Sequence, residues 1–345
     1  MNWPRPVTFR YRIYGLNLSS DFPIPGLREE ETESASFPDL GVELRAKPSW
    51  VSDALGMPSV VLQSLPASPE TQDPAFVLKS FGEGQFFQLA YSDGTHFVVN
   101  REATCIWGAA GESQTIEDLS TYLLGPVMGF ILRRRGTTAL HASSLCVDGK
   151  AIVLTGEAGA GKSTTAAALA LRGLPVLCED VAAIEEKDGS YSIERGYPRV
   201  CLWPDSVGLL MGRPDSLPRL SPNWEKCYLP LDDAAATLDV HKRPLGAVYL
   251  IAPREGAANA PRVEDVGSQD VLLELVQNTY MNWLLDRRQR AAEFEFLSRL
   301  VSHIPVRRVV PHSDPSRIGA LCELLVADAR SVLASKARMV VAAGQ

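Results

Sequence analysis

Eight residues near the middle of the chain restrict its fold more than any other segment. Gly156 to Ser163 reads Gly-Glu-Ala-Gly-Ala-Gly-Lys-Ser, the pattern of a phosphate-binding P-loop. The apolar run Ala151 to Thr155 precedes the loop, and the alanine- and leucine-rich run Lys162 to Leu171 follows it. A strand, a glycine loop and a helix in this order are the context that the motif requires, so the sequence predicts an α/β domain built around this loop.

The loop residues predict a nucleotide site. Glycines let successive backbone N–H groups turn inward, and the helix N-terminus adds unpaired donors and a partial positive charge. Lys162 is expected to reach the β- and γ-phosphates, and Ser163 to place its hydroxyl on Mg²⁺. The cofactors are therefore predicted to be ATP and Mg²⁺, with a chance glycine turn as the alternative. The predicted nucleotide-binding residues are Gly156, Glu157, Ala158, Gly159, Ala160, Gly161, Lys162, Ser163 and Thr164.

Composition restricts the class of protein. A chain of 345 residues with 46% hydrophobic content can form a sizeable core and suggests two domains. A net charge of −7 gives a surface that repels nucleic acid and anionic lipid, so neither is expected as a main partner. The six cysteines are far apart and form no CxxC pair or Cys/His cluster, which favours buried thiols over disulfides or a metal site.

Nothing in the sequence predicts secretion or membrane insertion. No apolar stretch follows the first residues, as a signal peptide would require. The charge-free, helix-like run Leu119 to Leu132 is too short to span a bilayer. We therefore expect a cytoplasmic protein, where ATP is supplied.

The pattern of apolar, polar and turn residues divides the chain into a β-rich first part and an α/β second part. Residues 1–115 read as short strands and turns, with polar loops at 29–34 and 64–73. The predicted strands are Arg10 to Leu18, Gly41 to Ala46, Ala75 to Ser80, Gln85 to Tyr91 and His96 to Asn100. A helix is predicted over Ile116 to Arg133, with Thr115 as its N-cap and a kink at Pro126. The predicted domains are thus 1–115, 116–334 and a tail, 335–345, read as an extension of the last helix or a frayed end.

After the glycine loop, strands and helices alternate. Arg213 to Asn223 is rich in proline and irregular, and the segment 213–230, with Trp224 and Tyr228, is a candidate substrate loop. The remaining predicted elements are a hairpin over Ile184 to Ile193, strands over Pro198 to Pro204, Leu245 to Ala252 and Val306 to Val310, and helices over Val271 to Tyr280, Asp286 to Ser302 and Pro315 to Ala334.

A hairpin before the loop places a histidine at the phosphate site. Leu140 to Val147 is followed by Asp148-Gly149, a strong signal for a two-residue turn, and then by the strand that enters the loop. This register sets His141 opposite Gly156. His141 is expected to hold the γ-phosphate or to steer the attacking group, or, alternatively, to cap backbone groups at the end of the strand.

A pair of acidic residues follows the next predicted strand. The helix after the loop ends at Gly173, and Leu174 to Cys178 then reads as a buried strand followed by Glu179-Asp180. A right-handed crossover makes this strand parallel to the strand before the loop, so both end at the same edge of the sheet. On an extended segment the two carboxylates point in opposite directions, which suits one to bind Mg²⁺ and the other to accept a proton. A solvated turn is the alternative.

The histidine, the loop and the acidic pair together resemble the HPr kinase/phosphorylase family in order and spacing. The matching residues are His141-Ala142-Ser143, Gly156 to Ser163 and Glu179-Asp180. The resemblance implies an HPr-kinase-like α/β core with a mixed sheet and flanking helices, preceded by a smaller β-rich domain. It implies that the first acid, Glu179, acts as the base and the second, Asp180, holds Mg²⁺. The chain departs from the family in having glutamate as the first acid.

A closer resemblance, over nearly the whole chain, is to the HPr-kinase-related lasso-peptide kinases. It rests on Tyr14-Gly15-Leu16, Pro23-Ile24-Pro25, Leu124-Gly125-Pro126, Gly196-Tyr197-Pro198-Arg199, Leu202-Trp203-Pro204 and Lys226-Cys227-Tyr228-Leu229-Pro230. It implies phosphorylation of a peptide hydroxyl, typically a serine at the C-terminus of the precursor. The expected partner is thus a peptide or small protein that carries a serine hydroxyl.

These observations define the candidate site and leave several functions open. The candidate catalytic residues are Glu179, His141 and Lys162, and the candidate metal ligands are Ser163 and Asp180; Arg195, Arg199 and Arg287 are candidate phosphate contacts. The alternatives are an HPr-type protein serine kinase, a kinase for a small-molecule hydroxyl, a regulatory nucleotide switch without an acceptor, and a partner-binding module that works through its N-terminal domain. A homo-oligomer stays open.

Overall fold

The computed structural model describes residues 8–30, 38–66, 74–232 and 234–343. Its contacts divide the chain into two compact units. The first comprises Met1–Arg135 and Leu220–Trp224, and the second comprises Gly136–Arg219 and Glu225–Gln345. The predicted boundary at residue 115 therefore falls inside the first unit, and a short segment from late in the sequence also belongs to that unit.

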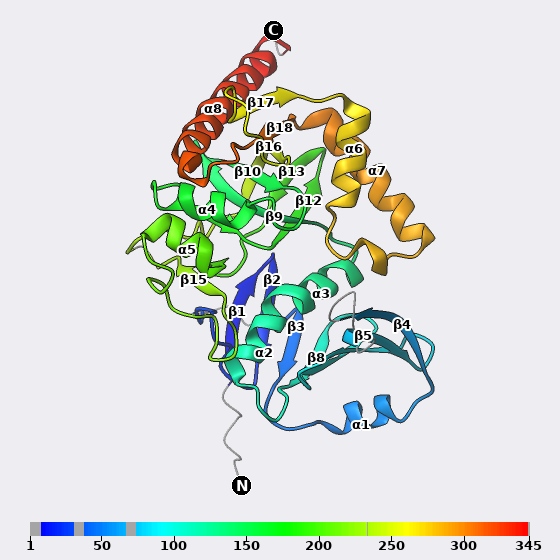
Figure 1. Ribbon diagram of the computed structural model, residues 1–345. Coiled ribbons are helices and arrows are strands. Elements are labelled where there is room, and N and C mark those ends of the chain that lie inside the picture. The colour runs from blue at the N-terminus through cyan, green and yellow to red at the C-terminus, as the bar shows by residue number, and fades with distance from the viewer. Residues whose placement is uncertain (1–7, 31–37, 67–73, 233, 344–345) are drawn as a thin grey trace. The chain divides into compact units, whose positions relative to one another are not determined.

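The first unit is built on an eight-stranded sheet, which confirms its predicted β-rich character (Figure 1). The strand order is β1-β2-β3-β8-β7-β6-β5-β4. Its elements are β1 Phe9–Ile13, β2 Leu16–Ser20, β3 Leu40–Glu43, α1 Ser49–Leu55, β4 Ser59–Pro66, β5 Pro74–Phe81, β6 Phe86–Tyr91, β7 His96–Asn100 and β8 Cys105–Ala109. Three of these elements, α1, β4 and β8, were not predicted.

Two sequence predictions in this unit need correction. The single strand predicted over residues 10–18 is a hairpin, because Tyr14 and Gly15 adopt φ values of 51° and 78° and reverse the chain between β1 and β2. The predicted loop at 64–73 is wrong over residues 64–66, which end β4. Residues 67–73, and residues 31–34 of the other predicted loop, lie outside the described residues.

The helical segment that follows belongs to the first unit because it packs on the first sheet. It consists of α2 Ile116–Tyr122, a π-helical turn over Leu123–Val127 that contains Pro126, and α3 Met128–Arg134. Thr115 caps α2 as predicted, within a capping box. The Tyr122 ring stacks on Tyr91 at 3.9 Å, and Phe130 meets Phe87 at 5.6 Å. These ring contacts account for the difference from the predicted boundary.

The second unit combines a mixed sheet with helices, as predicted for the α/β part. Its strands are β9 Thr138–Val147, β10 Lys150–Thr155, β11 Val176–Cys178, β12 Val181–Lys187, β13 Ser190–Ile193, β14 Arg199–Leu202, β15 Cys227–Pro230, β16 Arg243–Ile251, β17 Arg262–Asp265 and β18 Val306–Val310. Its helices are α4 Lys162–Ala170, α5 Pro204–Met211, α6 Ser268–Gln277, α7 Arg287–His303 and α8 Ile318–Ala343. Because α8 continues to Ala343, most of the predicted tail is a continuation of the last helix.

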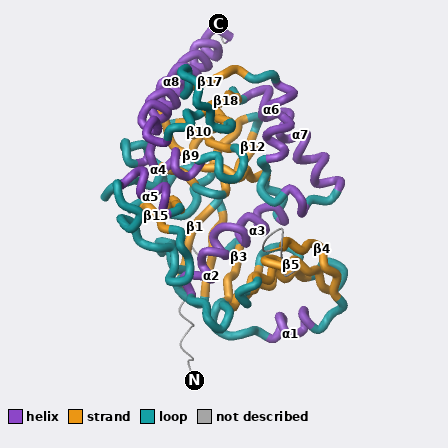
Figure 2. The backbone as a smooth tube through the Cα atoms, in the orientation of Figure 1, coloured by secondary structure: helices purple, strands orange, loops and turns teal. Residues whose placement is uncertain are grey.

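The topology of this sheet brings three loops to one edge. β10 pairs in parallel with β16, and β16 pairs in parallel with β18, so the loops that follow these strands leave the sheet together. Helices α4 and α8 lie on one face of the sheet, where they share a core with its apolar side chains (Figures 1 and 2). Strands β14 and β15 form a separate two-stranded ribbon, which contributes to the same core.

Two further features of the chain concern membrane-spanning helices and the cysteines. Within the described residues, no helix combines the length and apolarity needed to cross a bilayer. The six cysteines are free thiols; four are buried, as predicted, whereas Cys105 and Cys201 are partly exposed and differ from the prediction.

Candidate functional site

The predicted glycine loop connects β10 to α4 at the edge of the second sheet. Gly156, Gly159 and Gly161 have φ values of 148°, 80° and 101°, a region that side-chain-bearing residues rarely occupy. At Gly156 a Cβ atom would lie 2.6 Å from the carbonyl oxygen of Ile251, so only glycine allows the loop to pass this close to β16. The backbone thus requires glycine at this position for a reason that does not involve a ligand.

Lys162 lies beneath the loop rather than in solvent. Its side chain is buried, and its Nζ donates to the carbonyl oxygens of Gly156 at 2.8 Å and Glu157 at 3.0 Å. Burial lowers the pKa of Lys162, and the nearby carboxylates of Asp180 and Glu179 oppose this shift without cancelling it. The ammonium group is therefore held at the loop by hydrogen bonds to carbonyl groups that carry no net charge.

The predicted hairpin register is confirmed. Thr155 pairs with Ala142, so Gly156 and His141 are the next residues on the two strands. The Nδ1 atom of His141 lies 3.3 Å from a carboxylate oxygen of Asp180, and the ring lines the cavity beside the loop. Of the two predicted roles, this position favours one at the site over capping of a strand end.

The acidic pair reaches the predicted edge of the sheet, but its local geometry differs from the prediction. Strands β10 and β11 both pair antiparallel with β9, so they run parallel to each other with β9 between them. Asp180 has a φ of 66°, and the Val181 N–H donates to the Glu179 carbonyl at 2.8 Å, which closes a tight three-residue turn. The segment is therefore not extended, and both carboxylates line one cavity instead of pointing in opposite directions. A positive φ at an aspartate is the kind of backbone strain that often accompanies functional sites.

The two carboxylates have different partners. Glu179 accepts a hydrogen bond from the Ser163 hydroxyl at 2.7 Å and another from the Tyr197 hydroxyl at 3.2 Å. Asp180 accepts from the Tyr280 hydroxyl at 3.1 Å and faces His141. The structure thus brings Ser163 to Glu179, whereas the predicted metal pair was Ser163 with Asp180.

These partners shift the two pKa values in opposite directions. Burial raises the pKa of Glu179, and the negative charge of Asp180 raises it further. Burial also acts to raise the pKa of Asp180, but the hydrogen bond and charge of His141, together with Lys226 and Tyr280, outweigh it and leave that pKa below its ordinary value. Asp180 is therefore the carboxyl that this environment holds ionised, while Glu179 binds a proton more readily.

A cavity of about 290 Å³ joins the loop, His141 and the acidic pair. It is also lined by Cys201, Leu202, Trp203, Ser206 and Arg254, which the sequence did not assign to the site, and by Lys226, which belongs to the candidate substrate loop 213–230. Arg254 follows β16, and β16 ends at the same edge as β10. The rule that located the acidic pair, parallel strands ending at one edge, could have located Arg254 as well. Lys226 and Trp203 directly adjoin the two strands of the separate ribbon, whose position no sequence rule supplies.

The predicted arginines are not among the residues that line this cavity. Arg199 is buried, and its guanidinium group lies 5.3 Å from the Tyr197 ring centre and 5.9 Å from that of Tyr228. Arg287 is the first residue of α7.

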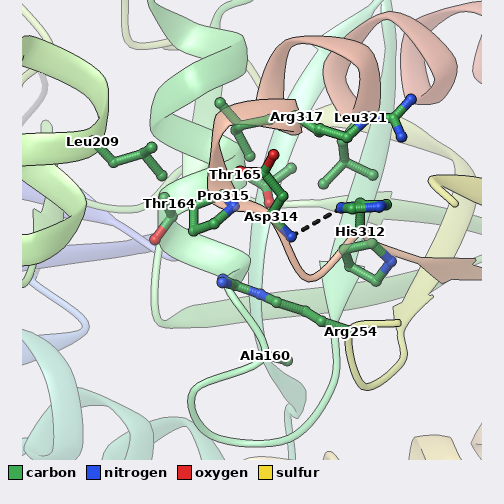
Figure 3. A pocket seen from close by; sticks show the side chains of 12 residues that line it. Ala160, Thr164, Thr165, Leu209, Arg254, His312, Asp314, Pro315, Arg317 and Leu321 are labelled. Atoms are coloured by element: carbon green, nitrogen blue, oxygen red, sulfur yellow. Dashed lines mark hydrogen bonds between the residues drawn. The ribbon is translucent and has the colours of Figure 1, made fainter. Parts of the chain in front are cut away.

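A smaller hollow, of about 30 Å³, shares Thr164 and Arg254 with this cavity as lining residues (Figure 3). Its walls include Ala160 of the glycine loop and the segment after β18, where the Asp314 N–H donates to Nδ1 of His312 at 2.9 Å. Figure 3 shows the Arg254 side chain extending along one side of this hollow. Residues of the glycine loop therefore line both the cavity that holds the acidic pair and the hollow beside the segment after β18.

The residues present fit a phosphate group and a hard cation that share the site. The described residues contain no group of three or more His, Cys, Asp or Glu side chains that could hold a metal by themselves. Mg²⁺ in nucleotide sites commonly uses one or two carboxylates and completes its shell with phosphate oxygens and water. A serine hydroxyl and a carboxylate at 2.7 Å, beside a loop shaped by glycines, match that smaller protein contribution.

Comparison with protein-family models gives no match, and comparison with curated proteins gives none. Among solved structures, the HPr(Ser) kinase/phosphatase from Coxiella burnetii is similar to part of the chain. The sequence identity is 15%, and the similarity covers 54% of this chain and 93% of the other, with a TM-score of 0.25.

Proposed function

We propose that the second unit binds Mg²⁺–ATP along the glycine loop and transfers the γ-phosphoryl group to a hydroxyl acceptor. The observation that carries the proposal is the composition of the 290 Å³ cavity. It combines a buried lysine at a glycine loop with two adjacent carboxylates whose hydrogen-bond partners differ. Phosphoryl transfer needs this combination of charge neutralisation and a separate proton acceptor.

We assign Glu179 and Ser163 to the Mg²⁺ side of the site. Their mutual hydrogen bond of 2.7 Å places both oxygens where one cation can contact them. This assignment reverses the roles implied by the family resemblance, in which the second acid holds the metal. The bound cation would supply charge that stabilises ionised Glu179, and so would offset the burial that raises its pKa.

Asp180 is then the proton acceptor. Its lowered pKa keeps it ionised at neutral pH, and His141 and Tyr280 fix its orientation. In the transfer, the bond between the γ-phosphorus and the β–γ bridging oxygen breaks, and its electron pair leaves with ADP. The acceptor oxygen forms the new bond to phosphorus, and its proton moves to the Asp180 carboxylate. Lys162 and the loop N–H groups stabilise the phosphate charge throughout.

The acidic pair and the smaller hollow define two ends between which the nucleotide would lie. With the γ-phosphate toward the acidic pair, the phosphate chain runs along the loop past Thr164, and the nucleoside end lies toward the hollow of Figure 3. As acceptor we propose a serine hydroxyl of a peptide or small protein, with a lasso-type precursor peptide as the specific candidate. This choice rests on the sequence resemblance; an HPr-type protein or a small-molecule hydroxyl is the alternative.

The Lys162→Ala variant tests the proposal. Removing the ammonium group should abolish phosphoryl transfer, a loss of at least about 100-fold, because the phosphate charge loses its main protein cation. The measurement is transfer of label from γ-labelled ATP to serine-containing peptides, with circular dichroism to check the fold. Lys187→Ala, which removes an exposed lysine from the end of β12, is the matched control and should keep full activity.

Two outcomes would contradict the proposal. Transfer that survives in Lys162→Ala would mean that the loop is vestigial. Phosphate release that no acceptor changes would favour a nucleotide switch over a kinase.

A further inference from the structure

The ribbon of β14 and β15 presents an aromatic ring and a cation to the cavity. The last pair in its antiparallel register is Leu202 with Cys227, so Trp203 and Lys226 are the next residues, at the end where residues 203–226 connect the two strands. The Nζ of Lys226 lies 5.0 Å from the centre of the Trp203 ring, and both side chains line the cavity that holds the acidic pair. Trp203 remains 56% exposed, which is unusual for a tryptophan that has only a structural role.

The ribbon is anchored to the helix that follows the glycine loop. Val200 and Leu202 of β14, with Cys227 and Leu229 of β15, are buried in the core cluster that includes the alanines of α4. The Ser206 hydroxyl at the start of α5 also lies within hydrogen-bond distance, 2.8 Å, of the Thr164 hydroxyl. The position of Lys226 is therefore tied to the loop itself rather than to a free surface segment.

Lys226 carries a charge that no described residue neutralises by an ion pair. Its contact within the described part of the chain is the face of Trp203. Its charge nevertheless acts on both carboxylates, because it is among the causes that lower the pKa of Glu179 and of Asp180. Lys162 is held under the loop by two carbonyl oxygens. Lys226 is a second cation in the lining of the same cavity, on the side of the ribbon.

We propose that Lys226 is a further catalytic residue, whose ammonium group contacts the γ-phosphoryl oxygens during transfer while the Trp203 ring holds it in place. This inference rests on the proposed kinase function. As the bond to the bridging oxygen breaks and the bond to the acceptor oxygen forms, negative charge is spread over the three equatorial oxygens. A cation already positioned by an aromatic face stabilises that charge without having to be ordered during the reaction.

An acceptor-independent measurement tests this role. Affinities are measured by calorimetry for Mg²⁺–ADP alone and for Mg²⁺–ADP with fluoroaluminate, which imitates the phosphoryl group in transfer. Lys226→Ala should leave the affinity for Mg²⁺–ADP within about twofold, and should weaken binding of the fluoroaluminate complex roughly 10- to 100-fold, the scale of one charged hydrogen bond. Lys226→Arg should recover most of the loss, and the control Lys187→Ala should change neither affinity.

The outcomes separate this inference from the function on which it rests. If Lys226→Ala weakens both complexes equally, or neither, the role in transfer is wrong while nucleotide binding stands. If the wild-type protein binds neither complex, the proposed function itself fails and this inference fails with it. Lys226→Ala that binds Mg²⁺–ADP normally is folded, so a fold defect cannot imitate the expected result.

Discussion

At the scale of single residues, two neighbouring carboxyl groups differ because their partners differ. Glu179 is buried beside Asp180 and accepts from the neutral hydroxyls of Ser163 and Tyr197. Asp180 faces His141, whose hydrogen bond and charge favour the ionised form. Adjacent residues of the same chemical class can thus differ in proton affinity, because burial and partner charge, not residue type, set the two pKa values.

The raised pKa of Glu179 predicts that removing its charge stabilises the ligand-free fold. Because the folded state binds this proton more tightly than the unfolded state, the contribution of Glu179 is favourable below its ordinary pKa and is lost as pH rises through the raised value. Glu179→Gln should therefore increase the free energy of unfolding at pH 7–8 by roughly 1 kcal/mol, with the gain vanishing near pH 4. Thermal unfolding over this pH range is the measurement.

The control for this prediction has the opposite sign. Hydrogen bonding to Lys242 lowers the pKa of Glu185, which is partly exposed, so Glu185→Gln should slightly reduce stability at neutral pH. If Glu179→Gln also destabilised the protein at pH 7–8, the ionised carboxylate would be a stabilising group and the environment described above would be wrong. Glu179→Gln should in addition weaken Mg²⁺-dependent nucleotide binding. This loss separates the effect of Glu179 on the ligand-free fold from its proposed role at the metal site.

At the scale of elements, the β9–β10 hairpin sets the register that brings His141 to the glycine loop. Its turn residues, Asp148 and Gly149, have φ values of 46° and 77°. No atom lies within 4 Å of a Cβ built on Gly149, so a substitution there would be opposed by backbone conformation alone. A substitution in this turn therefore tests how much the hairpin contributes to the free energy of unfolding, without disturbing any packing.

Gly149→Ala should lower the free energy of unfolding by about 1 kcal/mol, the cost of a positive φ at a residue with a side chain. Urea titration provides the measurement. Gly319→Ala is the matched control, because Gly319 lies in α8 and the nearest atom to its added Cβ is the flexible end of Arg172, at 3.2 Å. There the same substitution should be neutral or stabilising by about 0.5 kcal/mol. Equal losses at both positions would show that the turn conformation is not the cause.

At the scale of the whole molecule, the chain crosses between the two units more than once. It leaves the second unit after Arg219, contributes residues 220–224 to the first unit and returns at Glu225. The buried residue that contacts this short segment is Asp118, which accepts hydrogen bonds from Ser221 and Asn223, while the Tyr122 ring meets Trp224 at 5.3 Å. The two units therefore cannot be separated by a single cut of the chain.

Asp118→Ala should release this segment and destabilise the first unit by about 2–3 kcal/mol, because the buried Ser221 hydroxyl loses its acceptor and Asn223 loses a hydrogen bond. Limited trypsin digestion reports the release directly, since Arg219 and Lys226 flank the segment. Cleavage at these two sites should accelerate in Asp118→Ala. It should stay unchanged in Asp215→Ala, which removes an exposed carboxylate paired with Arg213. Equal cleavage in both variants would mean that Asp118 does not anchor the segment.

Local patterns were sufficient wherever the contacts that define an element are close in sequence. The Thr115 cap, the hairpin register at Asp148-Gly149 and the glycine loop all depend on residues within a few positions of each other, and the structure has them as predicted. The hairpin at Tyr14-Gly15 was missed because alternation continues across its turn. The unit boundary after Arg135 was not predicted, because it depends on ring contacts that α2 and α3 make with β6, a strand that lies well before them in the sequence.

The glycine loop, the approach of His141 and the arrival of two acids at one edge of a sheet can be predicted from the chain alone, because strand order and turn type follow from short-range chemistry. The contacts that those groups make depend instead on long-range packing. The tight turn at Asp180 places both carboxylates in one cavity, and Ser163 meets Glu179 rather than Asp180. The ribbon that presents Trp203 and Lys226 is positioned by burial against α4. Such packing depends on side chains far apart in the chain, and so no local pattern contains it.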